Sequence, residues 1–531
     1  ETDAITRLPV GSTLTSVEIL NVIGGAAVTI DTTTGVTGLT DLNVTNEAAN
    51  QTITAAATQN VTSVVTAQAA ADVIVNGGKA VSVTGTGVTA VANITIGGTT
   101  AAASTVAASS TATFVNNSAN DFTMGAHTIT GGTTVTSTQS AGLTASNTTA
   151  ALADATNGEI TQGAVTVTGD ANTTAVTVTQ DSAQSDVDTA GIGRIGIVNG
   201  AVTISDANQA STTLAGTITT ATVTGGAIVT IESGALTTLN LGGTITSVDA
   251  DDLGSLTTAA NTTLALNATG LVTTGAVVID TDITTLNLSG NTTASTIATL
   301  DIDGVITLNV SGDAKVTATA QADAALTSVV VTNTAGLSLG TALATAVAFT
   351  GGAGDDSILI GSTTKAITLG AGNDTVTTSS AAVGTGGSVA AGAGTADKII
   401  MTDALAAGAD ASPVFNTKFT GFEVLEISDA LVEDGLDLDG LNAVSTVILA
   451  AGATTATLTN LVSGGTVQFN DTNSTGTTTI TVKSALLTAA DVLNLVISNS
   501  GDVYAAATVN AANVETINIA AADAATAADA T

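Results

Sequence analysis

Residues 350–377 read TGGAGDDSILIGSTTKAITLGAGNDTVT, and this stretch decides the fold that the sequence predicts. Asp356 follows a glycine-rich run that begins at Gly351, and Asp374 follows a similar run that begins at Gly370. The two aspartates are 18 residues apart, and each precedes a short segment with aliphatic residues. An ordinary loop needs no such register, although a pair of glycine-rich turns is the plain alternative.

The stretch matches a known nonapeptide, Gly-Gly-x-Gly-x-Asp-x-U-x with U aliphatic, which is typical of the calcium-binding parallel β-roll of RTX proteins. Residues 351–359 fit every position, and residues 369–377 fit all but the first, which is leucine. Two nonapeptides form one coil of two strands, so equivalent residues should recur every 18 positions, as the two aspartates do. The sequence therefore predicts two neighbouring coils over this stretch.

Stacked coils of this kind predict a bound cation. Neighbouring strands lie about 4.8 Å apart, and two carboxylates at that spacing repel by roughly 3–4 kcal/mol at an effective dielectric constant near 20. A divalent ion would compensate this charge, and carboxylate and carbonyl oxygens favour Ca²⁺ over Mg²⁺. The predicted calcium-site residues are Gly352, Gly354, Asp356, Gly370, Gly372 and Asp374, with Gly392, Gly394 and Asp397 from a third loop.

The third loop departs from the motif. It has one residue too many between Gly394 and Asp397, and Asp397 follows Asp374 by 23 residues instead of 18. We keep Asp397 as an expected ligand with altered geometry.

Other acidic pairs are weaker candidates for calcium ligands. For any one of them, a solvated turn is an equally good interpretation. The sequences after Asp301 and Asp437 look like half of an EF-hand loop, but the earlier aspartate and the closing glutamate are missing, which excludes that motif. These candidates are Asp249, Asp251, Asp301, Asp303, Asp437 and Asp439.

Repetition extends along the whole chain. Residues 164–169, 175–179 and 201–204 alternate apolar and polar side chains, which is typical of half-buried strands. A Leu-Asn-Leu unit recurs at residues 239–241 and 286–288, and we expect its amides to hydrogen-bond from coil to coil. Residues 485–497 are the best helical candidate, but residues 492–497 read better as a strand.

These patterns predict an all-β chain, an irregular parallel β-solenoid of β-sheet repeats with an embedded calcium-binding RTX β-roll. We expect an irregular β-repeat region over residues 1–345, the calcium roll over 346–404, and further β-repeats over 405–531. A variant strand with a glutamate recurs around Glu18, Glu423 and Glu515.

The charge balance excludes several classes of partner. The 531 residues include 44 acidic and 8 basic residues, for a net charge of −36. Binding to nucleic acid is not expected, because phosphate recognition needs clustered lysine or arginine. No apolar stretch is long enough to cross a membrane as a helix, so we expect no membrane insertion. Cysteine is absent, so metal is the expected staple in place of disulfides.

Catalysis is not expected either. His127 is the only histidine, it lies in no recognisable motif, and we expect it at the surface or in a turn. A zinc site is improbable with one histidine and no cysteine. Paired carboxylates could serve a glycosidase, but aromatic residues, which form platforms for sugars, make up only 2% of the chain.

The calcium nonapeptides, the filler rich in Ala, Thr, Gly and Val, and the glutamate-bearing strands together resemble the RTX-type surface-layer (S-layer) proteins of bacteria such as Caulobacter. The stretches over residues 35–40, 173–180 and 363–367 carry the resemblance further. It implies a secreted structural protein that leaves the cell by type I secretion and self-associates into a calcium-dependent two-dimensional lattice at the cell surface. It also implies attachment to lipopolysaccharide through a region that this sequence does not contain.

Two other functions remain open at this point, a secreted RTX adhesin of a biofilm matrix and the non-catalytic calcium scaffold of an RTX hydrolase. What flanks the segment would separate them. The sequence starts at Glu1 without a methionine, so we expect it to be part of a longer protein in which a further calcium repeat precedes residues 1–22.

Overall fold

The computed structural model confirms a nearly all-β chain built mainly from parallel strands. It describes residues 13–97, 105–114, 122–143, 160–183, 197–250, 261–432, 434–470, 476–487, 489–498 and 507–521. The contacts divide the chain into two units, the first with residues 1–287 and 295–305 and the second with residues 288–294 and 306–531. Strand β24 (Thr285–Gly290) contributes residues to both units.

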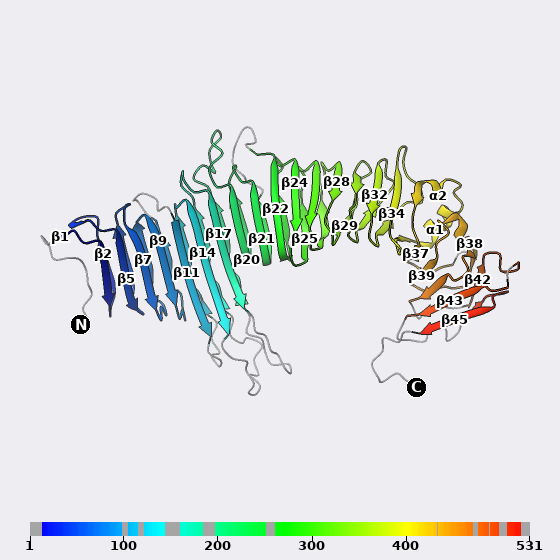
Figure 1. The fold of residues 1–531 in the computed structure, drawn as a ribbon, viewed down its shortest axis with the longest axis horizontal. Coiled ribbons are helices and arrows are strands. Elements are labelled where there is room, and N and C mark those ends of the chain that lie inside the picture. Colours follow the sequence, from blue (N-terminus) through cyan, green and yellow to red (C-terminus); the bar gives the residue numbers. More distant parts are fainter. Residues whose placement is uncertain are drawn as a thin grey trace, which may run out of the picture. The chain divides into compact units, whose positions relative to one another are not determined.

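The first unit consists of coils that stack through parallel ladders (Figure 1). One ladder joins β2 (Ile19–Gly24), β5 (Asp41–Glu47), β7 (Asn60–Thr66), β9 (Ala80–Thr86), β11 (Thr105–Phe114), β14 (Thr134–Leu143), β17 (Ala175–Ala183), β20 (Thr220–Glu232), β21 (Thr238–Ala250) and β22 (Thr263–Thr273). A second joins β3 (Val28–Asp31), β6 (Gln51–Ala55), β8 (Val73–Gly77), β10 (Ile94–Ile96), β13 (His127–Thr130), β16 (Val165–Thr168), β19 (Val202–Ser205) and the C-terminal part of β20.

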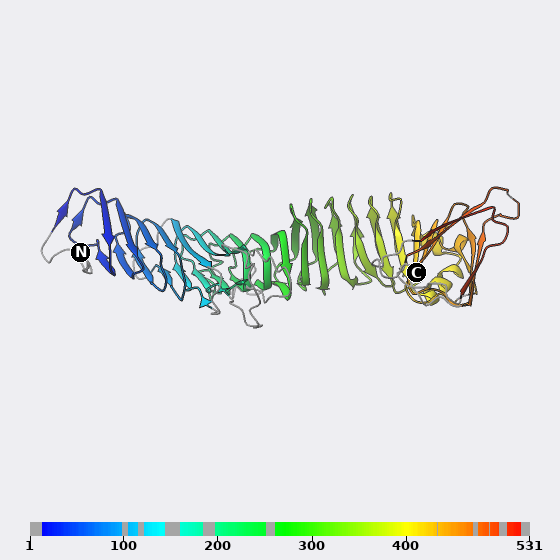
Figure 2. The ribbon, with the colours of Figure 1, turned by 90° about the horizontal axis from the view of Figure 1, so that it is seen from below.

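Shorter strands complete the first unit. They are β1 (Leu14–Thr15) with β4 (Val36–Thr37), β12 (Phe122–Thr123) with β15 (Ile160–Thr161) and β18 (Ile197–Val198), and β23 (Ala276–Ile279) with β25 (Ser295–Asp301). Figure 2 shows the strands of this unit, coloured from blue to green, following one another coil by coil.

Alternation of side chains explains why these segments form strands. In β16, Val165 and Val167 are buried while Thr166 and Thr168 point outward, so each coil adds small aliphatic side chains to the interior. The predicted amide contacts between coils are present as well. The Asn267 side-chain amide donates to the Asn240 amide oxygen at 2.7 Å, which confirms that prediction for Asn240.

The second unit uses the same principle with three ladders. The first joins β26 (Thr307–Gly312), β28 (Ser328–Val331), β30 (Ala348–Thr350), β32 (Ala366–Gly370), β34 (Ser388–Gly392) and β36 (Phe419–Thr420). The second joins β27 (Val316–Ala322), β29 (Leu337–Leu343), β31 (Ser357–Ile360), β33 (Thr375–Thr378), β35 (Lys398–Met401), β37 (Val424–Ile427), β39 (Thr446–Leu449), β41 (Thr466–Phe469), β43 (Val492–Ile497) and β45 (Thr516–Ala521). The third joins β38 (Asp434–Asp437), β40 (Ala456–Leu461), β42 (Gly476–Val482) and β44 (Ala507–Asn510).

Two short helices interrupt the β-repeats after residue 402, and the sequence analysis missed both. Helix α1 (Asp403–Asp410) begins after Thr402, whose side chain accepts the Leu405 amide hydrogen. Helix α2 (Phe415–Lys418) follows, and a short 3₁₀ turn, η1 (Leu438–Gly440), lies further along. Alanine strongly favours helix, so the alanine-rich segment in α1 forms one once a cap is present. Neither helix of the described residues is long and apolar enough to span a membrane.

Candidate metal centre

The two glycine-rich turns of the quoted stretch lie on neighbouring coils of the second unit. Strand β31 pairs with β33 in parallel, with Ser357 opposite Thr375. Asp356 and Asp374 directly precede these residues, so they occupy the same point of successive coils, as the 18-residue spacing predicts.

Four acidic side chains form what we call the carboxylate column, Asp356, Asp374, Asp397 and Glu423. Each accepts a backbone N–H from the coil before it. Asp356 Oδ1 accepts the Leu337 N–H at 2.7 Å, and Asp374 Oδ1 accepts the Asp356 N–H at 2.7 Å. The series continues with the Asp374 N–H to Asp397 Oδ1 at 2.8 Å and the Asp397 N–H to Glu423 Oε2 at 3.0 Å.

The second carboxylate oxygen, Oδ2, distinguishes Asp356 and Asp374 from Asp397. Asp356 and Asp374 are 1% and 0% exposed, and the Oδ2 atom of each is buried without a hydrogen-bond partner. A carboxylate oxygen can only accept, so two such atoms on neighbouring coils cannot satisfy each other. Buried polar atoms are rarely left unpaired, which makes this position the best candidate in the second unit for a cation.

The pKa values of Asp356 and Asp374 also show that these buried carboxylates are unfavourable in their charged form. Burial raises the pKa of Asp356 to about 7, and the charge of Asp374 adds to the rise, while the hydrogen bond from Leu337 opposes it. Burial likewise raises the pKa of Asp374 to about 6, with the charge of Asp397 adding to it. Both carboxylates are therefore poorly stabilised in their charged form by the protein alone.

The glycines allow the turns to approach each other closely. Gly370 and Gly372 have φ angles of +108° and +133°, which side-chain-bearing residues rarely adopt. A Cβ atom on Gly370 would lie 2.3 Å from the Gly352 carbonyl oxygen, and one on Gly354 would lie 2.1 Å from the Gly336 nitrogen. A Cβ atom on Gly351 would lie 1.7 Å from the Leu369 carbonyl oxygen and 2.6 Å from Asp356 Oδ2, so this carbonyl lies near the unpaired oxygen. Asp and carbonyl oxygens are the donor set that Ca²⁺ favours.

Asp397 belongs to the column, but it also accepts a hydrogen bond from within its own loop. Besides accepting from Asp374, it accepts the Gly394 N–H through Oδ2 at 3.1 Å. Both of its oxygens therefore have protein partners, unlike those of Asp356 and Asp374. Gly392 keeps a φ of +113° and stacks on Gly370, so the longer loop retains the turn but not the unpaired oxygen.

Glu423 is a member of the column that the sequence analysis did not assign to the site. Its pKa is raised, mainly by burial. Glu515 repeats the arrangement further along, since its Oε2 accepts the Asp491 N–H at 2.9 Å. The recurring glutamate-bearing strand was the signal, because in both cases the glutamate precedes a strand and reaches the aspartate one coil earlier.

The weaker acidic candidates are not gathered into comparable sites. Asp249 lies opposite Val278, which in turn lies opposite Asp301, so a valine separates the two acids. Asp303 is exposed, and Asp251 lies outside the described residues. Among the described residues, no group of three or more His, Cys, Asp or Glu side chains is arranged to hold a metal. The column therefore depends on carbonyl oxygens to complete any coordination shell.

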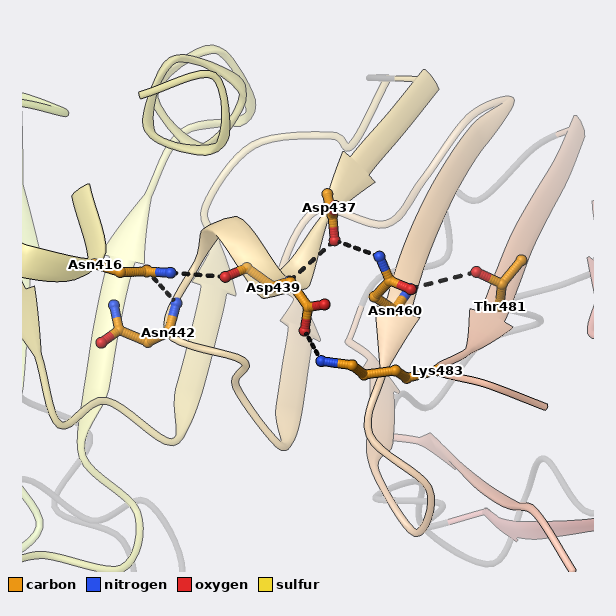
Figure 3. Close-up of polar contacts among 7 residues, drawn as sticks. All are labelled: Asn416, Asp437, Asp439, Asn442, Asn460, Thr481 and Lys483. Atoms are coloured by element: carbon orange, nitrogen blue, oxygen red, sulfur yellow. Dashed lines mark hydrogen bonds and ion pairs between the residues drawn. The ribbon is translucent and has the colours of Figure 1, made fainter. Parts of the chain in front are cut away.

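Asp437 and Asp439 have protein partners instead (Figure 3). Asp437 Oδ1 accepts from the Asn460 side chain at 2.8 Å and from the Asp439 N–H at 3.0 Å. Asp439 forms an ion pair with Lys483, with 2.7 Å between Oδ1 and Nζ. The Asn416 side chain donates to the Asp439 carbonyl at 2.7 Å, so this network joins separate coils through contacts within the protein.

The expectation for His127 was wrong. The side chain is 0% exposed in the first unit, on β13, where it takes an inward position of the alternating pattern. Its Nε2 lies 2.7 Å from Ser110 Oγ and its Nδ1 lies 2.8 Å from Ser137 Oγ. Burial lowers the pKa of His127 to about 4, so the ring is neutral at physiological pH and takes a structural role between two serines.

Comparison with known proteins gives no match to any family model and no significant match among curated proteins.

Proposed function

We propose that this chain is the structural, non-catalytic region of a calcium-stabilised bacterial S-layer protein, secreted and self-associating at the cell surface. Residues 346–404 would form its RTX calcium roll. The observation that carries the proposal is the pair of buried, unpaired Oδ2 atoms of Asp356 and Asp374 on neighbouring coils.

Calcium would be held by Asp356 and Asp374 together with carbonyl oxygens of the glycine turns. Bound there, the ion supplies positive charge that compensates the two carboxylates. The protein's part is to hold one oxygen of each aspartate by a backbone N–H, which orients the other oxygen within the column. Asp397 and Glu423 extend the ladder of hydrogen bonds to the following coils.

Assembly follows from the same chemistry. A chain with a net charge of −36 resists association, because like-charged surfaces repel. Extracellular calcium sites typically have a Kd of about 10⁻⁴–10⁻³ M, so they fill outside a cell and empty in the cytosol. Calcium would therefore fold the roll and permit lattice contacts after export.

The test is a calcium titration of the purified chain, followed by light scattering and negative-stain electron microscopy. We expect ordered sheets to form with calcium and not with sodium at matched ionic strength, since screening alone completes no coordination shell. Sheets that form in sodium with a chelator would exclude this mechanism. Calcium binding without sheets would favour the adhesin or scaffold functions.

A further inference from the structure

A cavity of about 350 Å³ lies in the second unit, between helix α2 and the turn over residues 381–386. Its volume is at the lower end of the range for ligand-binding pockets, which suits a ligand of about one ring. The turn is held by a hydrogen bond from the Gly387 N–H to the Gly384 carbonyl at 3.0 Å, and Gly386 has a φ of +88°. This wall is therefore a defined turn of the backbone.

The opposite wall is apolar. The rings of Phe415 and Phe419 line the cavity and stack with their centroids 4.6 Å apart. Val414, also in the lining, is 56% exposed, which is high for a valine beside a hydrophobic core. The two phenylalanines are themselves buried, so Val414 is the apolar surface that a ligand body could cover and remove from water.

Lys418 supplies the charge. It is the only charged residue in the lining, and it makes no hydrogen bond or ion pair with any residue that the structure describes. In a chain with 44 acidic and 8 basic residues, a partly buried lysine without an acidic partner is unusual. By contrast, Lys398 and Lys483 pair with Glu426 and Asp439.

Polar groups of the lining complement this charge. Thr385 and Ser412 both contribute to the cavity, and neither hydroxyl donates to another group of the described chain. A single ammonium matches a single negative charge, while a phosphate dianion would keep one negative charge without a cationic partner in the lining. The combination favours a monoanion attached to a compact body.

We propose that this cavity binds a small organic carboxylate of about one ring, with the carboxylate at Lys418 and the ring against the exposed side chain of Val414. Two kinds of molecule carry this chemistry, an acidic sugar and an aromatic or alicyclic acid. None of the lining residues belongs to the carboxylate column, but the turn over residues 381–386 lies within the roll that calcium is proposed to fold, so binding is measured with calcium present.

The experiment is saturation-transfer NMR on the full chain in the presence of calcium, with glucuronate and benzoate as probes. At least one acid should bind saturably with a Kd near about 1 mM, and the neutral analogue of that acid, glucose or benzamide, should bind about tenfold more weakly. Preference for glucuronate would identify the acidic-sugar class, and preference for benzoate the apolar-acid class.

Two variants test the location. Lys418→Met should weaken binding about tenfold, and Ala382→Phe should weaken it by filling the cavity while leaving the lysine in place. Lys79→Met, in the first unit, removes the same charge elsewhere and should leave binding unchanged. The proposal is overturned if neither acid saturates below about 10 mM, or if Lys79→Met weakens binding as much as Lys418→Met does.

Discussion

The two units bury polar side chains in different ways. In the first unit, the Gln51 amide donates to Asn46 Oδ1 at 2.8 Å and accepts from Ser63 at 2.6 Å, and His127 lies between two serines. In the second unit, Asp356 and Asp374 repeat the same acceptor on successive coils and leave two oxygens unpaired. The amide oxygens of Gln68 and Gln180 in the first unit are also buried without a partner, but they carry no charge, whereas stacked carboxylates need an added cation or proton.

The largest expected effect is therefore the removal of calcium, which should act on one unit only. Chelation should raise hydrogen exchange strongly in residues 346–404 of the second unit and leave the strands of the first unit protected. A site saturated at 100 times its Kd contributes about 2.7 kcal/mol to stability, and that contribution is lost with the ion. Equal exchange of residues 346–404 with and without calcium would show that the column is stable by itself.

Replacement of both column aspartates should reverse the effect of the metal. In Asp356→Asn/Asp374→Asn, two buried charges are gone, so the calcium-free protein should be more stable than the calcium-free wild type. With saturating calcium the order should invert, because the variant loses roughly 2–3 kcal/mol of ligand stabilisation. Thermal unfolding with chelator and with calcium measures both differences.

The matched control for this variant removes two exposed acids of the first unit that are not candidate ligands, Asp31→Asn/Glu47→Gln. This variant should respond to calcium as the wild type does. A calorimetric calcium titration that is the same in the column variant and in the wild type would eliminate Asp356 and Asp374 as ligands.

Acid should affect the two units in opposite directions when calcium is absent. The pKa values of Asp356 and Asp374 are raised from 3.8 to about 7 and about 6, so the folded state binds these protons more tightly than the unfolded state. Their protonation stabilises the second unit fully below pH 3.8, and this contribution is lost as the pH rises through about 6 and 7. Stability of the column should therefore increase as the pH falls across this range.

His127 gives the stability of the first unit the opposite dependence on pH. Its pKa is lowered from 6.5 to about 4, so the unfolded state gains the proton first as the pH falls. The loss of stability should begin near pH 6.5 and reach roughly 1.4 kcal/mol near pH 5.5. Hydrogen exchange of β13 peptides, corrected for the intrinsic rate at each pH, should show this slope in the wild type and a much smaller slope in His127→Gln.

The strands packed on β13 carry no other titratable group that could cause this effect. Its ladder partners β10 and β16, and the facing strands β11 and β14, contain only aliphatic residues, Ala, Gly, Ser, Thr, Gln and Phe. An unchanged slope in His127→Gln would mean that the acid sensitivity arises elsewhere in the first unit.

Local patterns made much of this fold predictable. Two-residue alternation identified strands such as β16 and β19, and the 18-residue spacing placed Asp356 and Asp374 on neighbouring coils. Both signals are short-range, because each coil repeats the geometry of the one before it. The strand assignment of residues 492–497 is confirmed by β43 for the same reason.

Features that depend on side-chain contacts between residues distant in the sequence were harder to predict. His127 takes an inward position in the alternation of β13, whereas the sequence analysis expected it at the surface or in a turn. Burial of the ring is compensated by contacts with Ser110 and Ser137, which lie on two other strands. These contacts depend on the tertiary structure, so the local sequence does not reveal them. The sequence analysis likewise recognised that the strand with Glu423 recurs, but it did not predict that Glu423 accepts the Asp397 N–H. The two residues are 26 positions apart, so no local pattern connects them.

The smallest expected effect concerns a carboxylate that already has a cationic partner. Asp439 pairs with Lys483 at 2.7 Å, but the two side chains are 36% and 49% exposed, so water and salt screen the pair. Lys483→Met should therefore cost less than about 1 kcal/mol in the free energy of unfolding. The cost should shrink further in high salt and should not depend on calcium. Chemical denaturation of Lys483→Met, with Lys365→Met as an exposed lysine outside this network, measures the difference. If calcium restored the stability lost in Lys483→Met, Asp439 would bind the cation once its lysine is removed. The difference between paired and unpaired carboxylates seen in the carboxylate column would then apply to this network as well.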